Sequence, residues 1–451
     1  MQKFAQRVVT LFERFMPEPF AFSVLMTFVA MVMAWSVTDA TPVEVVVSWG
    51  HGLSSLLPFI TQVCLTILFA FSLAHLGPVP RFLESLADVP KTASQAYAFA
   101  AVFTSAVCLI AWPLGTILGG LMAREIGLRF KARGDQVHYP LLGGAAFSGF
   151  VVWHMGYSAS APLLVATEGN PMQEMMGGIV PVTETLLSPY NLMTIVATVA
   201  VVAFMATRLA PADSDIEEID ESNLPGAVGS HLSQEAEQRP GLASRFEHAR
   251  WPTTLMGLIL FSYVGYWFYT RGVQLELNIV NWTFFGLCLL LARNASNLTD
   301  VMMQAGRAVI PTLLQYPLYG GIMGLMMGTG VVAMMASYFA EIGSAETLPL
   351  IAFFSGGFIN LFIPSGGAQW AVQGPAFLEA AKLLGTDPAL IVMAVAYGDQ
   401  WTNIIHPFIV IPLLIMTGLK ASKVLSYSFI LFLIATLPLA GGLLIASFAA
   451  G

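Results

Sequence analysis

The sequence predicts an all-α polytopic membrane protein, with about nine transmembrane helices and two re-entrant helical hairpins in two inverted repeats. Three observations lead to this fold class: the composition, a series of apolar runs as long as a bilayer is thick, and matched interruptions in both halves. Of the 451 residues, 56% are hydrophobic and 10% are charged. A soluble domain carries roughly 25% charged residues, because its surface faces water. The surface of this chain must therefore face lipid.

The net charge of −8 does not describe the whole chain, because nine of the 27 acidic residues fall within residues 210–250. This stretch is rich in Pro, Ser, Gly and Glu and poor in aromatic residues, which predicts a solvated acidic linker. Nothing in the charge pattern indicates nucleic acid as a partner. The three cysteines, Cys64, Cys108 and Cys288, lie in apolar runs without disulfide or zinc spacing, and we interpret them as small buried side chains.

The first 19 residues are amphipathic and basic, and no signal-peptidase-like site follows the first apolar run. They predict an interfacial helix that is retained in the mature protein rather than a signal peptide.

A membrane-spanning helix needs about 20 apolar residues. Runs of about this length occupy residues 19–38, 54–76, 140–167, 185–209, 252–270, 277–293, 308–328, 388–418 and 424–449. Two further stretches, 95–128 and 347–382, are apolar but interrupted in the middle. Each of these is either a re-entrant hairpin or a pair of full spans.

The basic residues predict the orientation. If the N-terminus is cytoplasmic and both interrupted stretches return to their own side, every Lys and Arg except Arg271 and Lys382 falls on the cytoplasmic side. The 210–250 linker is then cytoplasmic as well. The order of two spans, hairpin and two spans now occurs twice with opposite orientation, as in many secondary transporters.

The predicted units are a first repeat over residues 1–209 with hairpin 95–128, the linker 210–250, a connecting span 251–276, and a second repeat over residues 277–451 with hairpin 347–382. Weak internal similarity supports the repeat. Pro140 and Pro388 open corresponding spans 248 residues apart, and Trp153 and Trp401 stand at the same offset.

Four interruptions form two related pairs: the hairpin tips 112–116 and 363–367, and the broken spans 153–158 and 398–403. Backbone can be broken inside a bilayer only where it is buried in protein or lines a cavity, so these positions predict the binding site. A helix that restarts after a tip points free N–H groups at the cavity, which suits a carboxylate. The candidate substrate-binding residues are Asn360, Ser365, Gly366, Gly367, Gln369, Trp112, Gly115, Thr116 and Trp401. The alternative is that the second tip is a plain turn between two full spans.

Asp399 is the acidic residue that the pattern places inside a broken span, where an ionisable group is costly and usually functional. It is a candidate for holding a bound Na⁺ or a proton, while the alternative is a helix cap near a span end. The other candidates for cation or proton coupling are Asn403, His154, Ser158 and His406. A structural hydrogen bond is the alternative role for each histidine. The tryptophans line an apolar pocket or lie at the membrane interface.

At these motifs the sequence resembles the bacterial short-chain fatty acid transporter family (AtoE type) of the ion-transporter superfamily. The motifs are Pro140-Leu141-Leu142, Pro162 to Thr167 with Gly169-Asn170-Pro171, Asn360 with Pro364 to Gly367, Trp370 to Pro375, and Ala396 to Trp401. The resemblance runs nearly end to end and leaves out the linker. It implies uptake of short-chain carboxylates such as butyrate or acetoacetate across the bacterial inner membrane, an elevator-like motion of two hairpins, and a homodimer.

The leading functional hypothesis is a symporter that carries a short monocarboxylate with H⁺ or Na⁺ by alternating access, with no other cofactor and no enzymatic activity. The predicted spans hold no Lys or Arg to bind an anion, so the hairpin N–H groups and a bound cation must do so. The alternatives are a transporter of another organic anion, such as a dicarboxylate or an aminobenzoyl conjugate, and a channel. A distant alternative is an intramembrane hydrolase with Ser158 as nucleophile and His406 as base.

Overall fold

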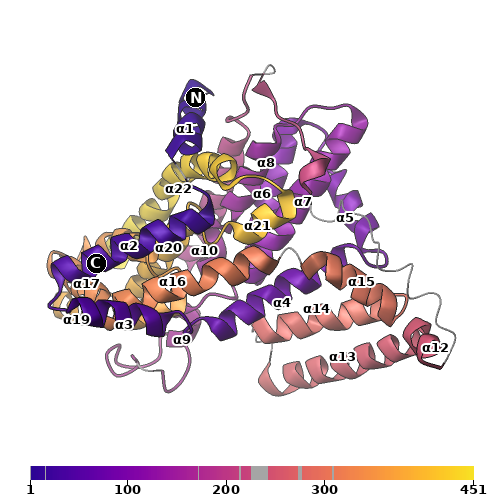
Figure 1. The fold of residues 1–451 in the computed structure, drawn as a ribbon. Coiled ribbons are helices and arrows are strands. Elements are labelled where there is room, and N and C mark those ends of the chain that lie inside the picture. Colours follow the sequence, from indigo (N-terminus) through magenta and orange to yellow (C-terminus); the bar gives the residue numbers. More distant parts are fainter. Residues whose placement is uncertain are drawn as a thin grey trace.

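The structure is a computed structural model that describes residues 2–15, 17–170, 172–212, 215–224, 242–272, 277–306 and 309–450. Within these residues every regular element is a helix, and no strand occurs (Figure 1). The elements are α1 (Gln2–Phe15), α2 (Pro19–Val37), α3 (Pro42–Gly52), α4 (Leu57–Ala74), α5 (Val79–Ala87), α6 (Ala93–Ile110), α7 (Trp112–Arg133), α8 (Tyr139–Ser148), the 3-10 helix η1 (Gly149–Met155), α9 (Ala161–Val165), α10 (Pro189–Ala206), the 3-10 helix η3 (Glu221–Asn223), α12 (Leu242–His248), α13 (Trp251–Arg271), α14 (Leu277–Leu291), α15 (Ala295–Gly306), α16 (Ile310–Gly328), α17 (Val331–Glu341), α18 (Leu348–Asn360), α19 (Gly366–Leu384), α20 (Pro388–Asn403), α21 (Ile411–Thr417) and α22 (Ala421–Ala450).

Several of these helices are long and apolar enough to cross a membrane. By length and composition, α2, α6, α10 and most of α22 qualify, and the number rises from four to six if the bent pairs α4–α5 and α16–α17 each count as one span. The predicted class of helical membrane protein is therefore confirmed. Of the remaining apolar runs, one forms the unbroken 21-residue helix α13 and the others form shorter or broken helices, so the count of nine spans stays a prediction.

Local sequence signals determine where these helices begin and end. Proline stands in the first turn of most of them, where its missing N–H costs nothing. Asp387 caps α20 by accepting the N–H of Ala389 at 2.9 Å. The second arms of both hairpins, α7 and α19, end on glycines in the left-handed conformation, Gly134 (φ 73°) and Gly385 (φ 71°).

The same order of elements occurs twice along the chain. A pair bent by 84° (α4–α5) precedes the hairpin α6–α7, a broken span (α8, η1 and α9) and the long helix α10. A pair bent by 63° (α16–α17) then precedes the hairpin α18–α19, a broken span (α20–α21) and the long helix α22. The expected repeat units and their inverted orientation stay predictions.

The helices form two packing groups, which Figure 1 shows. In the first group, α6, α8, α10 and α22 pack together, and α18 runs along α20. In the second group, α3 and α2 pack on α16, and α14 lies between α4 and α13. The amphipathic helix α1 packs on α22, with the rings of Phe12 and Phe429 5.4 Å apart. The expected N-terminal helix is thus present and rests on the first group.

Part of the predicted solvated linker is packed against the helices. Residues 215–224, which we call the strap, cross the ends of α7, α8 and α22. Ile219 is buried against Gly127, and Lys423 forms an ion pair with Glu217. The expectation of a fully solvated 210–250 segment is wrong for the strap, because its apolar side chains and acidic groups find apolar and basic partners. Residues 213–214 and 225–241 of that segment, residues 273–276 of the connecting span, and Pro171 lie outside the described residues.

One predicted interruption is in a different place. Residues 398–403 are helical, and α20 ends only at Asn403, so the break lies over residues 404–410. The glycine that suggested the break, Gly398, has another role: a Cβ there would collide with the carbonyl of Phe353, so the residue allows α18 to approach α20 closely.

Candidate functional site

The two hairpin tips have nearly the same backbone conformation. The first turns at Ala111 (φ −149°, ψ 96°), directly before α7. The second ends at Ser365 (φ −147°, ψ 102°), directly before α19. Both are extended residues at the N-terminus of a helix, so each tip leaves the first N–H groups of the following helix without an intrahelical acceptor. The predicted tips lie at these positions to within a few residues.

Both tips contact the same broken span. From the first hairpin, the N–H of Trp112 donates to the hydroxyl of Ser158 at 2.8 Å, and its ring centre lies 5.4 Å from that of Trp153. From the second hairpin, Gly366 approaches so closely that a Cβ would lie 2.5 Å from Cε1 of His154 and 3.0 Å from the indole of Trp153. The tips therefore meet at Trp153 and His154.

Beneath the second tip, His154 and Asp399 form a buried pair that joins η1 to α20. Nδ1 of the histidine lies 2.8 Å from Oδ2 of the carboxylate, and both side chains are 1% exposed. The other ring nitrogen, Nε2, lies 3.1 Å from the backbone nitrogen of Ala161. Since that N–H can only donate, Nε2 accepts, and the ring proton is on Nδ1 and points at Asp399.

This arrangement leaves one carboxylate oxygen unused. Oδ1 of Asp399 is buried and has no hydrogen-bond partner among the described residues. A buried carboxylate oxygen without a partner is costly unless it binds a proton or a cation. The pair can therefore take up one positive charge at Oδ1 while the hydrogen bond from His154 stays in place.

Residues that the sequence analysis did not select hold the pair in position. Oε1 of Gln400 accepts the backbone N–H of His154 at 2.8 Å. Asn191 on α10 donates to the carbonyl of Met155 at 3.2 Å and accepts the hydroxyl of Tyr397 at 2.7 Å. The position of Gln400 beside Asp399 was a usable signal, whereas Asn191 is one polar residue in an apolar run.

The side-chain amides that were expected to bind substrate at the second tip donate hydrogen bonds to other groups of the protein. Nδ2 of Asn360 donates to Oδ1 of Asn403 at 2.6 Å and to Oγ1 of Thr402 at 2.9 Å. Nε2 of Gln369 donates to the carbonyl of Gly356 at 2.8 Å. The amide oxygens of Asn360 and Gln369 remain buried without partners. Asn360 therefore fixes the second hairpin on α20, whereas Gln369 joins the two arms of the hairpin, and the two amide oxygens remain as acceptors near the tip.

Comparison with known proteins identifies the family. Residues 1–446 match the family described as short chain fatty acid transporter. The chain belongs to the short-chain fatty acid transporter family.

Two curated relatives, both named "Putative short-chain fatty acid transporter", agree with this assignment. The protein from Haemophilus influenzae is 32% identical over 93% of this chain and 94% of its own length. The protein from Escherichia coli is 34% identical over 95% of each chain. Because the family and these relatives are transporters, the chain is a membrane transporter and not an enzyme.

Two solved structures are also similar to this transporter. The Alcanivorax borkumensis YdaH transporter matches with a TM-score of 0.47 at 16% identity, over 95% of this chain and 98% of its own. Neisseria gonorrhoeae MtrF, described as one of a class of antimetabolite efflux pumps, matches with a TM-score of 0.40 at 17% identity, over 98% and 96%.

Two further candidate residues, His406 and Trp401, make hydrogen bonds away from the pair of His154 and Asp399. His406 uses both ring nitrogens on backbone groups, the carbonyl of Leu361 at 3.2 Å and the N–H of Phe408 at 3.2 Å. Trp401 donates to Thr436 at 2.9 Å, and its ring stacks on Phe432, so it fixes α20 against α22. The hydroxyl of Ser158, the nucleophile of the hydrolase alternative, accepts the N–H of Trp112 at 2.8 Å and so belongs to the first tip.

The remaining candidates belong to the first tip or the start of α19. Thr116 is buried, and Gly115 allows close approach of the first hairpin's arms, since a Cβ there would collide with Sγ of Cys108. Gly367 leaves room, because a Cβ there would lie 4.0 Å from Ser160.

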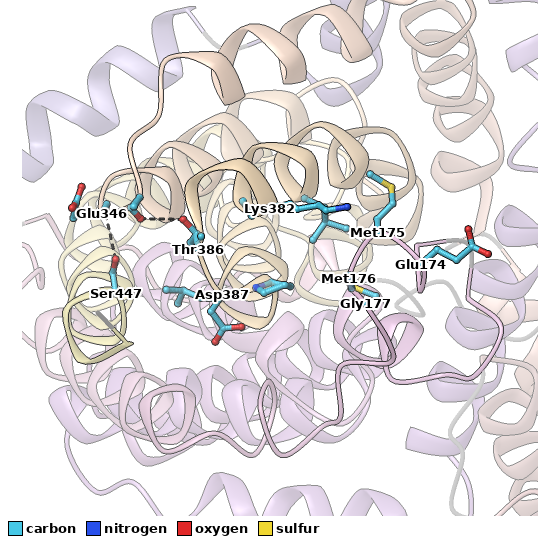
Figure 2. A pocket seen from close by; sticks show the side chains of 15 residues that line it. Glu174, Met175, Met176, Gly177, Glu346, Lys382, Thr386, Asp387 and Ser447 are labelled. Carbon is cyan, nitrogen blue, oxygen red and sulfur yellow. Dashed lines mark hydrogen bonds between the residues drawn. The ribbon is translucent and has the colours of Figure 1, made fainter.

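A cavity of about 580 Å³ lies away from these residues, at the far ends of α19 and α22 (Figure 2). It is lined by Lys382, Thr386, Asp387 and Ser447 among others, with the carbonyl of Ala345 accepting from Thr386 at 3.3 Å. This cavity is therefore not the place where the candidate polar residues of the transporter meet.

Proposed function

We propose that this transporter takes up short-chain fatty acids, such as butyrate or acetoacetate, with a co-transported H⁺ or Na⁺ by alternating access. The observation that carries the proposal is the contact of the second tip, at Gly366, with a buried pair whose Asp399 has one unpartnered oxygen. An anion site and a cation site are then neighbours.

The substrate carboxylate binds at the start of α19, where Gly366 and Gly367 offer backbone N–H groups and the helix dipole favours negative charge. Asp399 alone would repel a carboxylate. A proton or Na⁺ at its Oδ1 removes that repulsion, so anion and cation bind together. No Lys or Arg forms an ion pair with Asp399 among the described residues, which favours a singly charged substrate over a dicarboxylate.

Alternating access would exchange the exposure of this site between the two sides of the membrane. In the proposal, the hairpins α6–α7 and α18–α19 are re-entrant and the two halves are inverted repeats. The protein is a homodimer in the bacterial inner membrane, with its N-terminus and the 210–250 segment in the cytoplasm. The charge bias along the sequence supports this orientation.

The test is uptake of labelled butyrate into proteoliposomes under separately imposed proton and sodium gradients. One gradient should drive accumulation, and Asp399→Asn should abolish that accumulation while leaving the protein in the membrane. Asp387→Asn is the matched control, because it makes the same change on α20 at a helix cap that Asn also satisfies. Unchanged gradient-driven uptake in Asp399→Asn would remove this residue from coupling.

Competition by dicarboxylates and by an aminobenzoyl conjugate tests the substrate class. We expect butyrate and acetoacetate to compete and the larger anions not to compete. Strong competition by a dicarboxylate together with none by butyrate would overturn the proposed substrate class.

A further inference from the structure

An apolar groove of about 420 Å³ is formed by the N-terminal helices together with the second half of the chain. Side chains of α1 and of the first half of α2 form part of its lining, among them Phe15 and Leu25. The rest of the lining is Phe429 on α22, Leu361 directly after α18, and residues 405–407 in the break after α20. The groove therefore reaches from the amphipathic helix α1 to the segment that leads into the second hairpin tip.

The chemistry of this groove matches a hydrocarbon chain. Three of its apolar side chains are exposed: Leu11 by 55%, Phe15 by 68% and Leu25 by 51%. Because α2 qualifies as a membrane-spanning helix and α1 is amphipathic, exposed apolar side chains on these helices face lipid. Of the described residues that line the groove, only His406 is polar, and backbone groups occupy both of its ring nitrogens. The groove thus offers no polar partner to an occupant.

A positive charge stands at the edge of the groove. Arg14, in the last turn of α1, is exposed, and its guanidinium carbon lies 5.3 Å from the ring centre of Phe15. Arg14 forms no ion pair within the described part of the chain. Helical spacing puts Leu11 and Arg14 on one face of α1 and Glu13 on another, and Glu18 at the start of α2 does not line the groove. An anionic group at this edge therefore finds a cation that is available to it.

We propose that an anionic phospholipid, such as phosphatidylglycerol, binds in this groove, with its phosphate at Arg14 and one acyl chain along α1 and α2 as far as Leu361. A basic amphipathic helix attracts anionic headgroups, and an acyl chain suits an apolar lining. The carbonyl of Leu361 lies 3.2 Å from Nε2 of His406, so the bound chain contacts the place where the second hairpin joins the break after α20. The inference goes beyond the proposed function, because lipid binding does not depend on which solute is carried.

The test is photolabelling of the full-length transporter in proteoliposomes. The probes are a phosphatidylglycerol and a phosphatidylcholine that carry the same diazirine at the end of one acyl chain, and mass spectrometry locates the labelled residues. The matched reference inside the protein is Leu255 on α13, which lies outside the groove and is 51% exposed, as is Leu25. The ratio of phosphatidylglycerol label to phosphatidylcholine label at Leu25 and Leu361 should exceed the ratio at Leu255 about fivefold.

Two variants separate the headgroup from the chain. Arg14→Gln should remove most of the phosphatidylglycerol excess, about fivefold, at both groove positions. The matched control is Arg208→Gln, since Arg208 also stands over an exposed ring, that of Phe204, at 4.9 Å but outside the groove, and it should keep the excess. Met26→Trp narrows the groove and should reduce the label at Leu361 from both lipids.

A phosphatidylglycerol excess in the groove that Arg14→Gln removes and Arg208→Gln keeps supports the inference. Equal ratios at Leu361 and Leu255 overturn it, as does an absence of label at Leu361 from both lipids. Cross-links between the α1 helices of two copies in the unlabelled case would assign the groove to a second copy of the chain. If Arg14→Gln does not reach the membrane, the ratio in the wild type decides. None of these outcomes bears on the proposed function, which the gradient-driven uptake of butyrate tests separately.

Discussion

The two hairpins are alike at their tips and different at their far ends. At the tips, Ala111 and Ser365 share one backbone conformation, and both hairpins touch Trp153. The far end of α7 is attached to its neighbours: Arg129 pairs with Glu84 at 2.8 Å, and Lys131 pairs with Glu221 of the strap at 2.9 Å.

The far end of α19 has few such attachments. Cavities of about 580 Å³ and 430 Å³ border it, and Lys382 is exposed without an ion pair to any described residue (Figure 2). Hydrogen bonds join its two arms instead: Gln373 donates to Ser355 at 2.8 Å, and Gln369 donates to the carbonyl of Gly356 at 2.8 Å. Ion pairs therefore attach the far end of the first hairpin to its neighbours, whereas the far end of the second hairpin borders cavities and is held by packing and by hydrogen bonds near its tip.

The largest expected effect on uptake comes from blocking the close approach of the second tip to His154. Gly366→Ala should reduce butyrate uptake at least 100-fold, because the new methyl group must displace His154 from Asp399. Gly367→Ala is the matched control, since its methyl group meets only ordinary contact, and it should retain uptake. Equal activity of the two alanine variants would contradict the close approach of this tip. The measurement is initial uptake rate at equal protein in the membrane.

The next effect tests the attachment of the first hairpin. Ile219→Asp places a charge in the apolar notch at Gly127 and should release the strap, with a local cost of about 2–3 kcal/mol. Amide hydrogen exchange should then speed up at residues 127–133. In the wild type, residues 378–384 of α19 should already exchange faster than residues 127–133. Slower exchange at the end of α19 than at the end of α7 would reverse the comparison.

A smaller effect tests the cohesion of the second hairpin. Gln373→Leu keeps the volume of the side chain but removes its hydrogen bonds to Ser355 and Gln369, each of which then keeps one hydrogen bond to a backbone carbonyl. The free energy of unfolding should fall by about 2 kcal/mol. Thermal unfolding in detergent measures this loss, and an unchanged Tm would show that the amides do not hold the arms together.

Lowering the pH should weaken the attachment of the strap at His138, with a smaller loss of free energy than the substitutions above. His138 lies between α7 and α8, where burial lowers its pKa to about 4; nearby Glu217 and Asp215 oppose this shift and Lys423 adds to it. Nδ1 accepts the N–H of Glu217 at 3.0 Å, and Nε2 bonds the hydroxyl of Tyr427 at 2.9 Å. The ring must therefore stay neutral in the folded state. Above pH 6.5 its contribution is constant, and stability is lost as the pH falls from 6.5 toward 4, by about 1 kcal/mol at pH 6.

Proteolysis of the strap region as a function of pH measures this effect. His138→Gln should flatten the profile between pH 7 and pH 5, because glutamine does not titrate. A wild-type profile that is already flat over this range would contradict the role given to the histidine.

The sequence predicted the helical class and the positions of the two tips, because composition, Pro-Gly interruptions and glycine caps are local signals, while the re-entrant path of the hairpins stays a prediction. It did not predict the contact between His154 and Asp399, which lie 245 residues apart and meet only through the packing of η1 on α20. It misplaced the second broken span because Gly398 serves helix packing and not a turn. The strap was missed for a similar reason: its composition is that of a free linker, and Ile219 finds its apolar partners only in the folded protein.

The related tryptophans lead to a final consequence. Trp153 lies between the tips, whereas Trp401, at the matching place in the other half, faces α22. Residues at corresponding places in the two halves therefore make different contacts, and the repeated order of helices does not bring repeated chemistry with it. The same substitution at the two tryptophans is consequently not equivalent, because one residue contacts both hairpin tips and the other holds α20 against α22.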